Sequence, residues 1–80
     1  MKTIHDGRYI ALIELLRSKR IDMGLTHAEV ASRLHVPRSW VGKVEQRERR
    51  LDVLDLWRLC QIYGMKLSEL ERVLAEDERP

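Results

Sequence analysis

The sequence lacks the features that would place a protein outside the cytoplasm. Its 80 residues include one cysteine, Cys60, so no internal disulfide can form, which fits a reducing compartment. No stretch approaches the roughly 20 apolar residues that span a bilayer. The N-terminus also has no continuous apolar run of the secretory type. We therefore expect a soluble, cytoplasmic protein with no membrane partner.

Motifs for metal binding and catalysis are equally scarce. Metal-ligand spacing is missing among the histidines and the cysteine, which are His5, His27, His35 and Cys60. No Ser-His-Asp arrangement, glycine-rich phosphate loop or pair of carboxylates stands out. We therefore expect no metal, no cofactor and no enzyme activity.

The charge is small in total but unevenly distributed. The formal net charge is +2, yet residues 1–66 hold 13 basic and 8 acidic side chains. Residues 67–80 hold two basic and five acidic side chains. A basic body with an acidic end favours an anionic partner for one face, although net charge alone favours an ordinary solvated surface.

Apolar periodicity and helix-start signals organise the first half of the chain. Apolar residues recur at helical spacing until Gly24, which ends the pattern. Thr26 opens an S/T-x-x-E capping box for a second helix, and Pro37 suits the first turn of a third helix. The predicted helices cover about 8–23, 27–34 and 37–46.

Similar signals divide the second half. Asp52 can cap a fourth helix, and Gly64 closes it. A second capping box at Ser68 opens a fifth helix, and no strand pattern is present. The sequence thus predicts one compact, all-α, five-helix domain over residues 1–80, with a core at about 8–75 and a frayed tail at 76–80.

The second and third predicted helices are separated by a very short break. Two helices joined in this way form the unit that places a helix in a DNA groove. Val36 fills the turn, and Val41 and Val44 seat the third helix against the second. The opposite face of the third helix then carries hydrogen-bonding side chains that can contact base edges in the major groove.

Residues 20–74 resemble the helix-turn-helix domain of the phage repressor and Cro class, also called the XRE-type regulators. The matching segments are Arg20, GLTHAEVASRL at 24–34, Val36, Ser39, VGKVE at 41–45, ERRLDVLDL at 48–56 and YGMKLSEL at 63–70. The resemblance implies a five-helix, repressor-like fold and sequence-specific binding to double-stranded DNA. It also implies a transcriptional regulator that acts as a homodimer on a palindromic operator.

Four side chains are candidates for base contact. Arg38 can bridge both acceptors of a guanine, and Lys43 can contact a base or a phosphate. Ser39 either binds DNA or is a neutral filler. Trp40 has two interpretations: an outward indole would touch a thymine methyl or the DNA backbone, whereas packing against the second helix or the 47–50 loop would cover it.

A second group of candidates contacts phosphates. In the resembling family the loop after the third helix runs beside the DNA backbone. A Gln that touches a phosphate, and often a neighbouring side chain, stands where this chain has His27. We also expect Arg49 or Arg50 to pair internally with the aspartate at 52 or 55. The phosphate candidates are His27, Gln46, Arg47, Arg49 and Arg50.

The resemblance implies three structural roles as well. Arg20 and Glu45 match positions that form a partly buried ion pair in repressor domains. His35 stands where the family often has a glycine with positive φ. The dimer surface is placed near the fifth helix, where the candidates are Leu67, Leu70 and Leu74.

One function of another class stays open. The same fold could serve as a protein-interaction module, such as an antitoxin that binds a toxin or an enzyme, with DNA contact secondary. The salt dependence of DNA affinity would distinguish the two functions.

Overall fold

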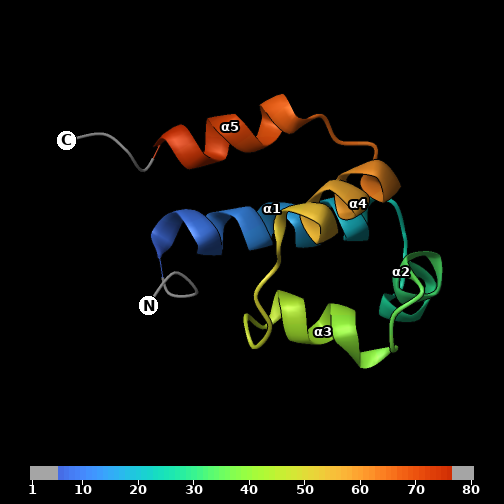
Figure 1. The fold of residues 1–80 in the computed structure, drawn as a ribbon. Helices are drawn as coiled ribbons and strands as arrows, with labels where there is room; N and C mark the ends of the chain where they lie inside the picture. Colours follow the sequence, from blue (N-terminus) through green and yellow to red (C-terminus); the bar gives the residue numbers. More distant parts are fainter. Residues whose placement is uncertain (1–5, 77–80) are drawn as a thin grey trace.

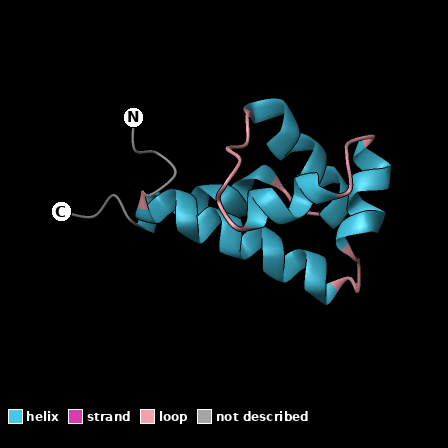
Figure 2. Ribbon diagram, turned by 90° about the horizontal axis from the view of Figure 1, so that it is seen from below, coloured by secondary structure: helices cyan, strands magenta, loops and turns pink. Residues whose placement is uncertain are grey.

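The computed structural model describes residues 6–76, which form five α-helices (Figure 1). No strand occurs within this range (Figure 2), so the predicted all-α, five-helix fold is confirmed. Glu76 is the last residue of the fifth helix, and the rest of the tail predicted to fray lies outside the described residues. The helices are α1 (Gly7–Asp22), α2 (His27–Leu34), α3 (Ser39–Glu45), α4 (Val53–Tyr63) and α5 (Leu67–Glu76).

The start of α2 is fixed by the predicted capping box. Thr26 Oγ1 accepts a hydrogen bond from the backbone N–H of Glu29 at 3.1 Å. Glu29 Oε1 accepts one in return from the N–H of Thr26 at 2.8 Å. Asp52 caps α4 by accepting from the N–H of Asp55 at 2.8 Å. These bonds satisfy N–H groups that have no partner inside the helix, which is why both helix starts could be predicted from the sequence.

Left-handed residues end α2 and α4. Gly64 has φ 65°, and His35 has φ 60°. The positive φ predicted for His35 is therefore confirmed. The N–H of Val36 then bonds to the carbonyl of Ala31 at 3.1 Å. This closure of the helix end reverses the chain within a few residues, so that α3 lies against α2.

The start of α3 differs slightly from the prediction. The helix begins at Ser39, and Arg38 occupies the cap position without a side-chain cap hydrogen bond. Pro37 belongs to the turn before the helix, where its carbonyl accepts from the N–H of Trp40 at 2.9 Å. The missing side-chain cap leaves α3 dependent on its packing.

The start of α5 is a correction. The helix begins at Leu67, one residue before the predicted cap at Ser68. Glu69 Oε1 instead accepts from the backbone N–H of Lys66 at 3.3 Å. The acidic side chain that closes the first turn is therefore Glu69, and the S-x-x-E pattern that begins at Ser68 lies inside the helix.

α1 is the central helix of the fold. It packs against α3, α4 and α5, while α2 packs against α3 and α4. α3 lies on one side of the α1 and α4 pair, and α5 lies on the opposite side (Figure 1). The side chains at the centre of the core are fully buried and come from four helices: Ile13, Val30, Val41 and Cys60.

Candidate nucleic-acid interface

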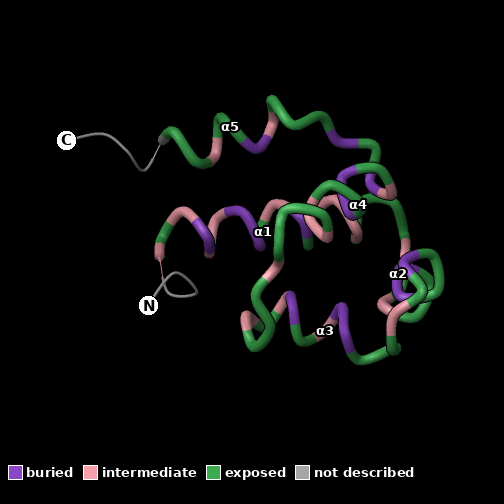
Figure 3. The backbone as a smooth tube through the Cα atoms, in the orientation of Figure 1, coloured by how far each residue is buried: buried purple, intermediate pink, exposed green. Residues whose placement is uncertain are grey.

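The crossing of α2 and α3 leaves one edge of α3 uncovered. Val41 and Val44 are buried against α2 and α1, and Ala31 is buried at the crossing. Val36 packs against this cluster from the turn. Figure 3 shows the buried side of α3 turned toward the rest of the domain and its exposed side turned away. The valines therefore seat α3 as the sequence predicted.

Hydrogen-bonding side chains gather on the uncovered side of α3. We call this side the outer edge, and it includes the exposed residues of the helix and one exposed residue at each of its ends. Among the described residues, the side chains of Arg38 and Lys43 have no hydrogen-bond or ion-pair partner. A guanidinium and an ammonium group therefore face solvent with all their donors free. The outer edge consists of Arg38, Ser39, Lys43 and Gln46.

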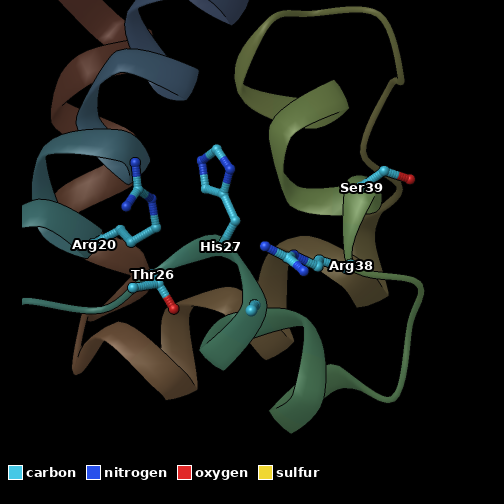
Figure 4. Close-up of a pocket in the computed structure, with 6 residues that line it drawn as sticks. Arg20, Thr26, His27, Arg38 and Ser39 are labelled. Carbon is cyan, nitrogen blue, oxygen red and sulfur yellow. The ribbon is translucent and has the colours of Figure 1, made fainter.

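An open groove separates the start of α2 from the start of α3 (Figure 4). Arg38 points across this groove toward the beginning of α2, whereas the hydroxyl of Ser39 points away from it. Thr26 and His27 form the opposite wall. Two helix starts and an arginine thus converge on one concave surface, where N–H groups and positive charge favour an anion.

An ion-pair network at Glu45 holds this surface together. Arg20 donates to both carboxylate oxygens of Glu45, with Nε to Oε2 at 2.7 Å and Nη2 to Oε1 at 3.1 Å. Arg20 Nη1 also donates to the carbonyl of Leu25 at 2.8 Å. His27 Nε2 lies 3.0 Å from Glu45 Oε1, and Arg17 lies at the edge of the network at 3.9 Å. The ion pair predicted between Arg20 and Glu45 is present.

The protonation state of Glu45 follows from its surroundings. Its side chain is only 8% exposed, and burial alone would raise the pKa of the carboxyl group. The hydrogen bonds and charges of Arg20 and His27 outweigh burial, so the pKa of Glu45 lies below its ordinary value. Hydrogen bonding to Glu45 also raises the pKa of Arg20. Both partners are therefore charged at neutral pH.

His27 has a second role beside the predicted phosphate contact, and the sequence did not identify its partner. It was predicted to contact a phosphate, but its Nε2 is directed at Glu45. The side chain is only partly covered and also lines the groove beside Arg38. The only signal in the sequence was the resembling family's habit of pairing this position with a neighbouring side chain. A phosphate contact by His27 stays a prediction, and it would involve the part of the ring that faces the groove.

Trp40 is a correction to the predicted base contacts. Its side chain is 7% exposed and belongs to the core, so it does not point outward. The guanidinium of Arg49 lies over the indole, 5.6 Å from the ring centroid. The alternative interpretation, packing near the loop, is therefore the one that the structure supports. Trp40 precedes Val44 by four residues, a spacing that places both on one face of a helix.

The segment 47–50, which we call the basic loop, is anchored at both ends. Arg47 adopts φ 62° and reverses the chain after α3, and its Nε is buried without a hydrogen-bond partner. Beyond the loop, the N–H of Leu51 donates to Tyr9 Oη at 3.1 Å. Arg49 is held over Trp40, and Arg50 is exposed. Anchoring lowers the conformational entropy lost when such side chains bind an anion.

The predicted internal pairing of this loop is wrong. Within residues 6–76, neither Arg49 nor Arg50 forms an ion pair with Asp52 or Asp55. The side chain of Asp52 instead caps α4. The guanidinium groups of Arg49 and Arg50 therefore keep their charge available to an external partner.

The predicted dimer surface is corrected at one of its three positions. Leu70 is 4% exposed and belongs to the core. Leu67 and Leu74 are exposed and line a groove beside Arg8 at the start of α1. A contact through these two leucines stays a prediction, whereas Leu70 is already covered by the chain itself.

Among residues 6–76 there is no group of three or more His, Cys, Asp and Glu side chains that could hold a metal ion. Cys60 is a free, buried cysteine, and burial raises the pKa of its thiol. No helix within the described range has both the length and the apolar character needed to cross a membrane.

Comparison with known proteins identifies the family. A family model for the helix-turn-helix domain matches residues 11–73. The chain is also similar to a solved structure of an XRE-family like protein from Pseudomonas syringae pv. tomato str. DC3000, with 43% sequence identity and a TM-score of 0.81. That match covers 99% of this chain and 95% of the other. The chain belongs to the XRE-type helix-turn-helix family. No curated protein matches it.

Membership of the XRE-type family agrees with the geometry of the surface. The family consists of DNA-binding regulators, and it typically lacks enzyme activity. In this XRE-type domain the uncovered edge of α3, the groove beside it and the basic loop lie next to one another. These elements can therefore act together on a DNA duplex.

Proposed function

We propose that this XRE-type domain is a cytoplasmic transcriptional regulator that binds a palindromic operator as a homodimer. The outer edge of α3 carries the proposal, because Arg38 and Lys43 are exposed and unpaired while Val41 and Val44 hold the opposite edge in the core. A helix presented in this way fits the major groove of duplex DNA.

Base contacts and phosphate contacts are made by different residues. Arg38 and Lys43 contact base edges, and Ser39 adds a base or backbone contact. The basic loop and Gln46 contact phosphates, together with His27 at the start of α2. Phosphate contacts supply affinity and orientation, whereas base contacts supply specificity. Two copies would place their α3 helices about 34 Å apart, one turn of the duplex.

Selection from a library of random duplexes tests this function. The proposal expects enrichment of one palindromic sequence, with half-sites about one helical turn apart. Enrichment of a sequence with a single half-site would contradict the homodimer, and the absence of any enriched sequence would contradict specific recognition. The selected duplex then serves as the operator for all further measurements.

The salt dependence of binding separates this function from that of a protein-interaction module. Each phosphate contact reduces the logarithm of the binding constant by roughly one unit for each tenfold rise in salt. Several contacts from the basic loop predict a steep dependence. An affinity for the selected duplex that barely changes with salt would favour the protein-interaction module.

A further inference from the structure

Three large apolar side chains lie exposed at the start of α4. The exposed fractions are 79% for Val53, 64% for Leu54 and 50% for Trp57. Their spacing places them close together on the surface of the helix, because residues three and four apart are neighbours. We call this group the α4 patch. Apolar side chains gathered at one exposed place indicate a surface that a partner covers.

We propose that the α4 patch binds a second copy of this chain, with the two α4 helices antiparallel about a two-fold axis. The proposal rests on the proposed function in one respect, since it assigns the surface through which the homodimer forms. The α4 patch takes the place of the dimer surface predicted near α5. One of the three leucines of that predicted surface, Leu70, is already buried in the core.

The arrangement of the helices supports this pairing. α3 lies on one side of the α1 and α4 pair, and α5 lies on the other (Figure 1). A two-fold axis that runs from the α5 side to the α3 side, past the exposed face of α4, keeps both α3 helices on the same side of the dimer. Their outer edges, which face away from the domain (Figure 3), then point toward one duplex. A two-fold contact of this kind uses the same patch on both copies.

The charged residues beside the α4 patch can form opposite-charge contacts when two copies pair antiparallel. Asp52 and Asp55 stand at the start of α4, and Arg58 stands one turn further along on the exposed side. Arg58 has no hydrogen-bond or ion-pair partner among the described residues. An antiparallel pairing brings the acidic start of one α4 against Arg58 of the other copy, twice in each dimer. A parallel pairing would place like charges side by side.

The edge of α5 opposite α3 does not offer the same geometry. Pairing through that edge would direct the two α3 helices away from each other, because α3 lies on the far side of the domain (Figure 1). Leu67 nevertheless provides a matched control, since it is an exposed leucine near the start of its own helix. The same substitution can therefore be made at both surfaces.

Sedimentation equilibrium without DNA, over a concentration series, tests the pairing. The unmodified chain is expected to form a dimer, and Leu54→Glu is expected to raise its dissociation constant by about tenfold or more, because it places a charge in an apolar contact. Leu67→Glu is expected to leave the constant unchanged. Circular dichroism establishes that both variants keep their helical content. A monomeric unmodified chain, or a dimer that responds to Leu67→Glu and not to Leu54→Glu, would overturn the proposal.

A reciprocal charge exchange tests the antiparallel orientation. Arg58→Asp and Asp55→Arg are each expected to weaken the dimer, since each places like charges opposite one another across the axis. The double variant Arg58→Asp/Asp55→Arg restores the opposite-charge contact and is expected to recover most of the affinity. A double variant weaker than both single variants would rule out this orientation.

DNA binding distinguishes failure of the pairing from failure of the function. A dimer that depends on Leu54 but binds no selected duplex would contradict the proposed function and support the α4 pairing. Binding to a palindrome by a dimer that is insensitive to Leu54→Glu would support the function and overturn the pairing.

Discussion

His27 Nε2, at the first residue of α2, lies 3.0 Å from Glu45 Oε1, at the last residue of α3. This contact joins the two ends of the helix-turn-helix unit that are far from its turn. Arg20 of α1 donates to the same carboxylate, so one buried acidic side chain connects three helices. The angle at which α3 stands out from the domain therefore depends on Glu45 as well as on the valines beneath it.

Glu45→Ala is expected to destabilise the domain far more than Glu48→Ala. Removing one partner of this partly buried pair leaves Arg20 without its counter-charge, which costs up to about 3 kcal/mol. Glu48 is exposed on the basic loop, and its removal is expected to change the unfolding free energy by less than about 0.5 kcal/mol. Urea unfolding measures both values. Equal losses would mean that the network has no structural role.

The stability of the domain is expected to depend on pH through Glu45. Burial acts to raise the pKa of Glu45, but Arg20 and His27 outweigh it and hold the folded-state pKa below the ordinary value of 4.5. The stabilisation by the charged Glu45 carboxylate is therefore fully present at pH values above 4.5. It is lost as the pH falls through the lowered folded-state pKa. Unfolding free energies measured from neutral pH to about pH 3 should fall less steeply in Glu45→Gln than in the unmodified chain. Identical slopes would contradict the assignment.

Gly42→Ala is expected to stabilise the domain by up to about 1 kcal/mol, because alanine favours a helix interior over glycine. A Cβ atom at this position would lie 3.4 Å from His27 Nδ1, which is ordinary van der Waals contact. Thermal unfolding measures the change. A lower melting temperature would show that the His27 ring has no room to accept the methyl group, and that the glycine is needed for the contact between α2 and α3.

Trp40→Ala is expected to cost about 3–5 kcal/mol, as is typical of a large aromatic side chain removed from a core. Arg49→Ala is expected to cost less than about 1 kcal/mol, since it removes only a contact at the surface of the indole. The two variants together establish whether Trp40 acts mainly through packing. A small loss in Trp40→Ala with a large loss of DNA specificity would support the outward orientation that the structure contradicts.

Much of the fold could be predicted because its signals are local. The Thr26 and Glu29 capping box and the Asp52 cap each lie within one turn of the helix they open. The left-handed turn at His35 could also be predicted, because the resembling family often places a glycine there. The predictions that depended on distant contacts were less accurate. The internal pairing expected for Arg49 or Arg50 is absent, since the Asp52 side chain caps α4 instead and Asp55 forms no ion pair with either arginine.

In the candidate site, too, the features set by local sequence could be predicted, and those set by distant contacts could not. The exposed position of Lys43 follows from helical periodicity with Val41 and Val44, and the structure places it as expected. Arg38 lies three residues before Val41, a spacing that would put both on one face of a continuous helix; it is exposed at the cap position, before the helix begins. The direction of Trp40 was left open because α3 is seven residues long, and a helix that short has a poorly defined apolar stripe. The contact between His27 and Glu45 joins residues 18 apart in the sequence, and only the folded chain brings them together.

The most direct test of the account compares Arg38→Ala with Arg50→Ala on the selected operator and on random duplex DNA. Because Arg38 is assigned to a base and Arg50 to a phosphate, Arg38→Ala should remove most of the preference for the operator, at a cost of about 1–3 kcal/mol in operator binding. Arg50→Ala should weaken binding to both duplexes alike and reduce the salt slope by about one. An unchanged ratio of the two affinities in Arg38→Ala would contradict the claim that the outer edge of α3 recognises the DNA sequence.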